Sequence, residues 1–279
     1  MERNKAVDFV AGIMITYMVF THVCQHLDYD KSPLYVNMEH VLYFFMPWFF
    51  FKAGMFFHMD ESKEVLKKSF DRLIRPFILY SFIGHLCYLV VCYIKGSFHL
   101  STLIPWHSLL MQGSIPGNLP LWFLLSLFCC RIILNELIKR GISVSWITVL
   151  SLLGAYYLHL INFEEPFYFA NTLTGLFFMS LGYKCSIYPP RLLYVYILIY
   201  VISLAYPSFV GMRSNHLYYG FYLLWIIYSV CGILTANYIG SVVIKHSCAK
   251  RVPIIKILNL IGEYSMEIYC IHWIVLLFI

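Results

Sequence analysis

The sequence predicts an all-α polytopic membrane protein with about nine transmembrane helices and a cytoplasmic N-terminus. Composition, recurring apolar runs and the distribution of positive charge all indicate this class. Of the 279 residues, 61% are hydrophobic and only 12% are charged, whereas a soluble domain has about a quarter of its residues charged. The mean hydropathy is +0.73. These values exclude a soluble enzyme, a nucleic-acid-binding domain and a disordered protein.

Apolar runs of about 20 residues recur along the whole chain, and each is long enough to cross the ~30 Å hydrocarbon core as a helix. The first run is long and lacks a small-residue cleavage site, so we do not expect a cleavable signal peptide. Residues 1–279 are predicted to form a single transmembrane domain. The nine predicted spans are Ala6–His26, Met38–His58, Leu73–Lys95, Leu119–Ile138, Ile142–Ile161, Pro166–Tyr183, Leu192–Phe209, Leu217–Gly240 and Ile261–Ile279.

Positive charge sets the predicted orientation. With the N-terminus in the cytoplasm, the cytoplasmic segments contain fifteen Lys and Arg residues: Arg3, Lys5, Lys63, Lys67, Lys68, Arg72, Arg75, Lys139, Arg140, Lys184, Arg191, Lys245, Lys250, Arg251 and Lys256. The outer segments contain three, which are Lys31, Lys95 and Arg213. This asymmetry follows the positive-inside rule. It also accounts for the net charge of +6 through anionic lipid headgroups, without a nucleic-acid partner.

The predicted cytoplasmic loop between the second and third spans reads MDESKEVLKKSFDRLIRPF. Acidic residues and Ser62, a capping residue, open it, as at the start of a short interfacial helix. Arg72 and Arg75 are three residues apart and are expected on one helix face, where two guanidinium groups would hold phosphate. Alternatively, Lys67, Lys68 and the two arginines only anchor the loop at lipid headgroups.

The predicted outer loop from Gly96 to Pro120 is long and irregular. Loops of this length are often functional or fold back into the protein. Trp106 and His107 in this loop could contact a sugar, or the tryptophan could simply lie at the membrane interface.

The nine cysteines are scattered, without spacing that would hold a metal ion, so no metal site is predicted.

Ionisable side chains inside the predicted spans mark candidate functional positions, because a charge there costs roughly 2.5–3.5 kcal/mol. Asp8, Ala11 and His22 share one helix face, since positions eleven apart nearly superimpose around an α-helix. This face is predicted to line a path through the protein rather than to contact lipid. Arg131 is expected to snorkel toward the cytoplasm. The other ionisable candidates are His26, Lys52, His85, Glu267 and His272.

Five sequence blocks, in order along the chain, carry a family resemblance. They comprise an Asp, a Gly-Ile pair and a His in the opening helix, an aromatic run ending in a small residue and Gly, an R-x-x-R-P motif, a Trp in LPLWFLLSLF, and a closing EYSMEIYCIHW. The matching residues are Asp8, Gly12, Ile13, His22, Phe49, Phe50, Phe51, Ala53, Gly54, Arg72, Arg75, Pro76, Trp122, Ser265, Ile268, Tyr269 and His272. In this order the blocks resemble the membrane acyltransferase-3 family, whose members usually have ten spans.

The chain departs from the family pattern at three places. Ala11 replaces the Arg or Lys that the family usually has immediately before the helix-one glycine, and that cation is associated with the acyl donor. One hypothesis is that the ammonium group of Lys52 serves the same region. Ala53 replaces the usual Ser, and relatives generally continue into another span where this chain stops at Ile279, as expected of a short family member or a truncated reading frame.

The resemblance implies an O-acyltransferase of the bacterial cytoplasmic (inner) membrane, with acyl-CoA, most often acetyl-CoA, as a donor substrate rather than a bound cofactor. The donor phosphates are expected at Lys67, Lys68, Arg72 and Arg75, with Lys52 nearby. The acceptor is a hydroxyl of a cell-surface or lipid-linked carbohydrate. A hydroxyl needs a positioned base, and His22, with a pKa near 6.5 when unperturbed, is the predicted one.

Two further residues complete the predicted catalytic set. Glu39 is the expected partner of His22, and His272 has either a structural or a substrate-binding role. His22 either activates the acceptor directly or first carries the acyl group itself. Two alternatives to the enzyme remain at this point: a transporter or flippase of a glycan precursor, and a catalytically silent relative of the acyltransferases.

Overall fold

The computed structural model describes residues 4–99, 102–163, 165–187, 190–211, 216–246 and 252–279. These residues are predominantly helical, with one short two-stranded sheet formed by β1 (Phe209–Gly211) and β2 (His216–Tyr219). The chain divides into two compact units that interleave along the sequence. Unit 1 comprises residues 1–52, 188–210 and 217–269, and unit 2 comprises residues 53–187, 211–216 and 270–279.

Four helical segments are long and apolar enough to cross a membrane: Lys5–His26, Ser62–Ile94, Leu119–Lys139 and Tyr222–Lys245. They correspond to the predicted first, third, fourth and eighth spans. The predicted fifth, sixth, seventh and ninth spans correspond to α7 (Val144–Leu160), α8 (Phe167–Ile187), α9 (Leu193–Ala205) and α12 (Ser265–Leu276). The helical class is therefore confirmed, while the number of spans and the cytoplasmic N-terminus remain predictions.

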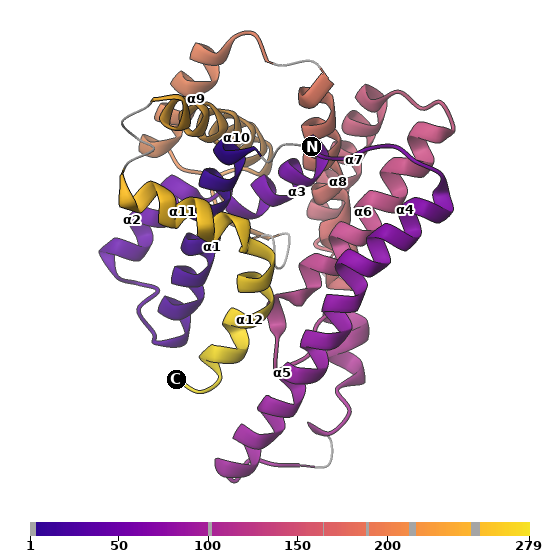
Figure 1. Ribbon diagram of the computed structural model, residues 1–279, viewed down its shortest axis with the longest axis vertical. Helices are drawn as coiled ribbons and strands as arrows, with labels where there is room; N and C mark the ends of the chain where they lie inside the picture. Colours follow the sequence, from indigo (N-terminus) through magenta and orange to yellow (C-terminus); the bar gives the residue numbers. More distant parts are fainter. Residues whose placement is uncertain (1–3, 100–101, 164, 188–189, 212–215, 247–251) are drawn as a thin grey trace. The chain divides into compact units, whose positions relative to one another are not determined.

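Unit 1 is organised around α1 (Lys5–His26), which begins where the Asn4 side chain accepts hydrogen bonds from the backbone N–H groups of Ala6 and Val7. Figure 1 shows α1 beside α11 (Pro253–Glu263). Glycines permit this crossing. A Cβ atom on Gly12 would collide with the backbone carbonyl oxygen of Leu258, and one on Gly262 with that of Asp8. The two helices therefore pack backbone against backbone, as small residues permit in membrane proteins.

The predicted second span is wrong as a single helix. The run Met38–His58 contains the end of α2 (Pro33–Leu42) and the whole of α3 (Phe45–Met55), separated by a turn at Tyr43 and Phe44. Pro47 explains the break, because a proline ring clashes with the carbonyl group four residues earlier, here that of Tyr43. Buried contacts hold the turn: the hydroxyl of Tyr43 lies 3.0 Å from that of Ser203.

Other predicted boundaries are also corrected. The ninth span does not begin at Ile261, because α11 ends at Glu263 and α12 starts after a turn at Tyr264. The seventh span is shorter than predicted at its C-terminal end, because α9 stops at Ala205. The eighth span starts later than predicted, because α10 (Tyr222–Lys245) begins after β2. Apolar residues alone did not mark these limits, since the strands between the two helices also contain apolar residues.

Unit 2 contains one long helical segment that was predicted as two pieces. Helix α4 (Ser62–Ser69) continues through a π-helical turn, η1 (Phe70–Ile74), into α5 (Arg75–Ile94). The expected short interfacial helix is thus continuous with the third span. Ser62 is not the capping residue, because Glu61 occupies that position and makes no side-chain capping bond.

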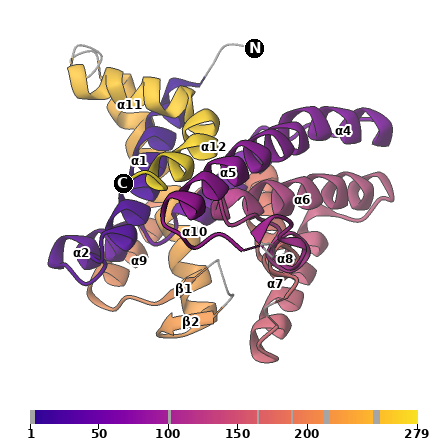
Figure 2. The same ribbon diagram turned by 90° about the horizontal axis from the view of Figure 1, so that it is seen from below.

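The remaining helices of unit 2 pack around α8. Figure 2 shows α8 close to α7 and to α6 (Trp122–Lys139). The segment between α5 and α6 contains a π-helical turn, η3 (Ser108–Gln112), and a 3₁₀ turn, η4 (Leu119–Leu121). It folds back onto the helices, because Gly113 lies against the side chain of Tyr168 and Gly117 against the backbone of Gly84. This confirms that the long loop is irregular and folds back into the protein.

Candidate active site

His22 lies in the last turns of α1, in unit 1, and its side chain is half-buried. Asp8 and Ala11, predicted to share its helix face, are buried, with 8% and 0% of their surfaces exposed. This face therefore points into the protein at both of those levels rather than into lipid. A neutral imidazole nitrogen can accept a proton from a hydroxyl.

Glu39 is half-buried on α2 of the same unit. The side chain of Gln25 donates a hydrogen bond of 3.1 Å to the hydroxyl of Tyr35 and so links α1 to α2. His22 lies three residues before Gln25, and Glu39 lies four residues after Tyr35. Each therefore lies near the face of its helix that carries this bond. The pairing of His22 with Glu39 remains a prediction.

The packing of α1 explains why position 11 lacks the family cation. Ala11 is fully buried and directly precedes Gly12, whose backbone touches the backbone of Leu258. A Lys or Arg side chain at position 11 would have to displace the residues packed around Ala11. The replacement of the family cation by Lys52 remains a prediction.

Lys52 supplies a half-buried ammonium group at the end of α3. Its Nζ atom lies 5.5 Å from the centre of the Trp48 ring, within cation–π range. The Trp48 ring is fully buried, and its Nε1 donates a 2.9 Å hydrogen bond to Asn237 of α10. Gly240, one turn further along α10, lies against Ala6 and Val10 of α1. Lys52 and the start of α1 are thus both anchored to the same stretch of α10.

The predicted phosphate-binding cations belong to unit 2, and all four side chains are exposed. They are Lys67, Lys68, Arg72 and Arg75, and we call them the basic cluster. Lys68 pairs with Asp60, and Arg75 Nε lies 3.1 Å from Asp71 Oδ1. The ion pair raises the pKa of Lys68 and, through the hydrogen bond from the same ammonium, lowers the pKa of Asp60. Arg72 makes no ion pair within the part of the chain that the structure describes, so its guanidinium group is available.

Arg131 of α6 joins this cluster, which sequence reasoning missed. Its Nε donates a 3.1 Å hydrogen bond to the hydroxyl of Ser69, and its guanidinium lies 5.7 Å from the centre of the Phe57 ring. Arg72 is close enough to repel it electrostatically. Neither arginine is paired with a carboxylate among the described residues. Two guanidinium groups held near each other without a carboxylate form a natural binding site for an anion.

A signal for this role was present in the sequence. Arg131 lies inside an apolar helix, where an arginine needs a partner or a watery cavity. Its partners Ser69 and Phe57 belong to other segments of the chain, so the sequence of α6 alone does not reveal them. The π-helical turn begins directly after Ser69, and such turns are frequent at functional sites.

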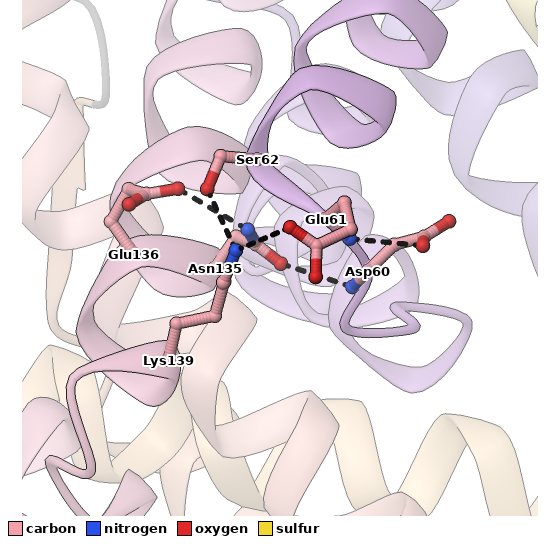
Figure 3. Close-up of polar contacts among 6 residues, drawn as sticks. All are labelled: Asp60, Glu61, Ser62, Asn135, Glu136 and Lys139. Carbon is pink, nitrogen blue, oxygen red and sulfur yellow. Dashed lines mark hydrogen bonds and ion pairs between the residues drawn. The ribbon is translucent and has the colours of Figure 1, made fainter.

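A polar network holds the start of α4 against the end of α6 (Figure 3). Asn135 accepts a 3.2 Å hydrogen bond from the backbone N–H of Asp60. Lys139 donates to Glu61 at 3.1 Å and to Ser62 at 3.0 Å. These bonds fix the first turn of α4 on α6. They thereby hold the basic cluster on one helix beside Arg131 on the other.

The other residues of the family pattern are mostly buried. A Cβ atom on Gly54 would collide with the carbonyl oxygen of Met179, so this glycine permits a close helix crossing in unit 2. The Trp122 ring packs edge-on against Phe167 at 5.2 Å. His272 is 6% exposed on α12. Tyr269, one turn earlier, is equally buried. The role of His272, structural or substrate-binding, remains open.

Comparison with known proteins identifies the family of the chain. A family model described as an acyltransferase domain matches residues 4–279. No curated protein and no solved structure gives a match. The family match covers nearly the whole chain and includes His22, the basic cluster and His272. The chain therefore belongs to the acyltransferase-3 family of membrane acyltransferases.

Proposed function

We propose that this protein transfers an acyl group, most simply acetyl, from cytoplasmic acyl-CoA to a hydroxyl of an extracytoplasmic glycan or glycolipid. The observation that carries the proposal is the family match over residues 4–279. The acceptor oxygen attacks the thioester carbonyl carbon, a C–O bond forms and the C–S bond breaks. The hydroxyl proton passes to His22 and then to the departing thiolate of CoA.

The donor binds through its phosphates. Arg72 and Arg131 provide two guanidinium groups without a carboxylate partner among the described residues, and Lys67 adds an exposed charge. Arginine matches phosphate geometry with paired N–H donors. Lys68 and Arg75 contribute less in this proposal, because acidic neighbours already neutralise much of their charge.

The acceptor hydroxyl is activated by His22. A neutral imidazole has one ring nitrogen that can accept the hydroxyl proton. Glu39 orients the ring or stabilises the imidazolium that forms. Both residues lie on helix faces joined by the Gln25–Tyr35 hydrogen bond. Lys52, anchored over Trp48, replaces the cation that the fully buried Ala11 cannot provide.

In the proposed reaction the N-terminus and the basic cluster face the cytoplasm, where acyl-CoA is found. The membrane is the bacterial cytoplasmic membrane. The excess of Lys and Arg in the predicted cytoplasmic segments supports this orientation.

The test is mass spectrometry of surface glycans from cells with and without the gene, together with an assay of purified protein and acetyl-CoA in lipid nanodiscs. We expect one acetyl group per repeat unit to disappear without the gene. Glycan movement without consumption of acetyl-CoA would instead indicate a transporter. Absence of both transfer and acetyl-CoA hydrolysis would indicate a silent relative.

A further inference from the structure

A second polar site lies in unit 2, where the segment between α5 and α6 folds onto α5. A Cβ atom on Gly84 would lie 2.7 Å from the carbonyl oxygen of Gly117 and 3.0 Å from Cβ of Asn118. This close approach sets Asn118 against the face of α5 that holds Gly84. Ser81 and His85 flank this glycine and are four residues apart, so they lie near each other on the same side of the helix.

The protonation of His85 follows from its one hydrogen bond. Its Nε2 atom lies 3.0 Å from the backbone carbonyl oxygen of Leu103. A carbonyl oxygen only accepts, so Nε2 must carry the hydrogen. In the neutral ring, Nδ1 is then a bare acceptor. This Nδ1 atom is buried and has no hydrogen-bond partner among the described residues.

Asn118 adds a second acceptor of known orientation. Its Nδ2 donates a 2.8 Å hydrogen bond to the carbonyl oxygen of Cys270. This bond fixes which end of the amide is nitrogen. The opposite atom, Oδ1, is buried without a partner in the described chain, and the residue is 0% exposed. The hydroxyl of Ser81, also buried, is the third unpaired atom.

The hydrogen-bonding capacity of these three atoms defines the kind of ligand that would pair with them. Folded proteins pair nearly all buried polar atoms, so three unpaired ones around a single helix contact need an explanation. Two of them accept only, and the Ser81 hydroxyl can donate or accept. The complementary group presents at least two O–H donors and a further oxygen. No carboxylate, ammonium or guanidinium belongs to the set, so the group is expected to be uncharged.

We propose that Ser81, His85 and Asn118 form a binding site for a neutral polyhydroxyl group, in which His85 Nδ1 and Asn118 Oδ1 each accept a hydrogen bond from a hydroxyl. This inference rests on the proposed function, because the bound group would be the carbohydrate acceptor of the acyl transfer. His85 lies ten residues beyond Arg75, about 15 Å along α5. One helix therefore carries the basic cluster at its start and this hydroxyl site further along.

Two substitutions of His85 separate binding from structure. His85→Gln can keep the hydrogen bond to Leu103, because the Gln amide nitrogen can replace Nε2, but it removes the acceptor at Nδ1. His85→Asn keeps an acceptor at the Nδ1 position and loses the bond to Leu103. If His85 only anchors the loop, the protein tolerates His85→Gln and does not tolerate His85→Asn. If His85 binds a hydroxyl, His85→Gln is the damaging change and His85→Asn retains part of the binding.

The direct measurement is nitrogen NMR of protein labelled in its histidine rings, in lipid nanodiscs, with the His85 signal assigned by its loss in His85→Gln. We expect a non-protonated Nδ1 whose signal moves on addition of methyl β-D-glucopyranoside and does not move with the permethylated glucoside. A protonated Nδ1, or equal responses to both compounds, would overturn the proposal. If His85→Gln fails to fold, the signal is assigned with His85→Asn, and Ser81→Ala is expected to weaken the glucoside response.

Transfer kinetics then distinguish this site from the proposed reaction. We expect His85→Gln and Ser81→Ala to raise the acceptor KM about tenfold and leave acetyl-CoA affinity unchanged. Glucoside binding at His85 without any acyl transfer would refute the acyltransferase and leave the site standing. Transfer with unchanged kinetics in both variants would refute the site and leave the acyltransferase standing.

Discussion

Single ionisable side chains within apolar helices carry most of the proposed chemistry. His22 and Arg131 are both partly buried, and each is positioned by a helix whose other residues are mainly hydrophobic. Such groups persist in a membrane protein when a partner, a cavity or a substrate compensates for the loss of water. Their substitution therefore tests function more sharply than substitution of exposed charges.

His22→Ala is expected to reduce acyl transfer by about 10²–10⁴-fold, the usual contribution of a general base. Acyl-CoA binding is expected to persist, because the basic cluster is unchanged. Transfer of radiolabelled acetyl and equilibrium binding of acetyl-CoA measure the two effects separately. Undiminished transfer would remove His22 from the mechanism.

Lys52→Met is expected to abolish transfer and to leave the amount of protein in the membrane unchanged, because the ammonium group acts on the donor and the Trp48–Asn237 hydrogen bond does not need it. Lys95→Met is the matched control, since Lys95 is an exposed lysine to which the proposed reaction gives no part. Equal activity in both variants would show that Lys52 does not replace the cation missing at Ala11.

Arg131→Met and Arg72→Met are each expected to weaken acetyl-CoA binding by about 10–100-fold, as expected for loss of a charge-assisted hydrogen bond worth about 1.5–3 kcal/mol. Arg75→Met is expected to have a smaller effect, because Asp71 already pairs with that side chain. Arg140→Met, an exposed change directly after the helix that carries Arg131, serves as the control. Binding should also fall with added salt, and salt-independent binding would argue for a purely topological role.

At the scale of helices, the contact between α1 and α11 depends on the absence of side chains. Gly12→Ala is expected to destabilise the protein by about 1–3 kcal/mol, a typical cost of overpacking, because the new methyl group meets the Leu258 backbone. Gly154→Ala is the control, since its methyl group would meet only the flexible end of the Leu173 side chain. Thermal unfolding in detergent measures both, and equal melting temperatures would contradict the close crossing.

The sequence identified most helices and missed where some are interrupted. Helices α1, α5, α6 and α10 were predicted because their apolar runs are long and uninterrupted. The break at Tyr43 was missed because Met38–His58 is apolar throughout its central part, although Pro47 carried the relevant signal. Continuity from α4 into α5 was missed because the polar composition of residues 62–69 suggested a separate interfacial helix.

For the candidate site residues, too, the sequence predicts what depends on one segment and misses what depends on contacts between segments. Hydropathy and motifs singled out His22, Lys52 and the basic cluster as candidates, since each stands out within its own segment, and their roles remain predictions. Arg131 was noted only as a snorkelling side chain because its partner Ser69 lies 62 positions earlier in the chain. Unpaired atoms such as His85 Nδ1 depend on the folded path of a loop, which no local pattern specifies.

For the whole molecule, the distribution of Lys and Arg predicts which loops face the cytoplasm. In a cysteine-free background, Arg140→Cys is expected to be protected from a membrane-impermeant maleimide added to intact cells, while Lys95→Cys is labelled. Disrupted cells should label both positions. The opposite pattern would invert the topology and would place the basic cluster away from cytoplasmic acyl-CoA.

The π-helical turn Phe70–Ile74 has a consequence for how this protein tolerates insertions and deletions. Each residue of an α-helix advances the chain by about 100° around the axis. Deleting one residue from this wide turn would let the coil tighten into ordinary α-helix, so Lys67 and Lys68 would keep nearly their present direction and α5 would still be long enough to span the bilayer. Losing a residue from the regular part of α5 would instead turn the rest of that helix by about 100° relative to the basic cluster.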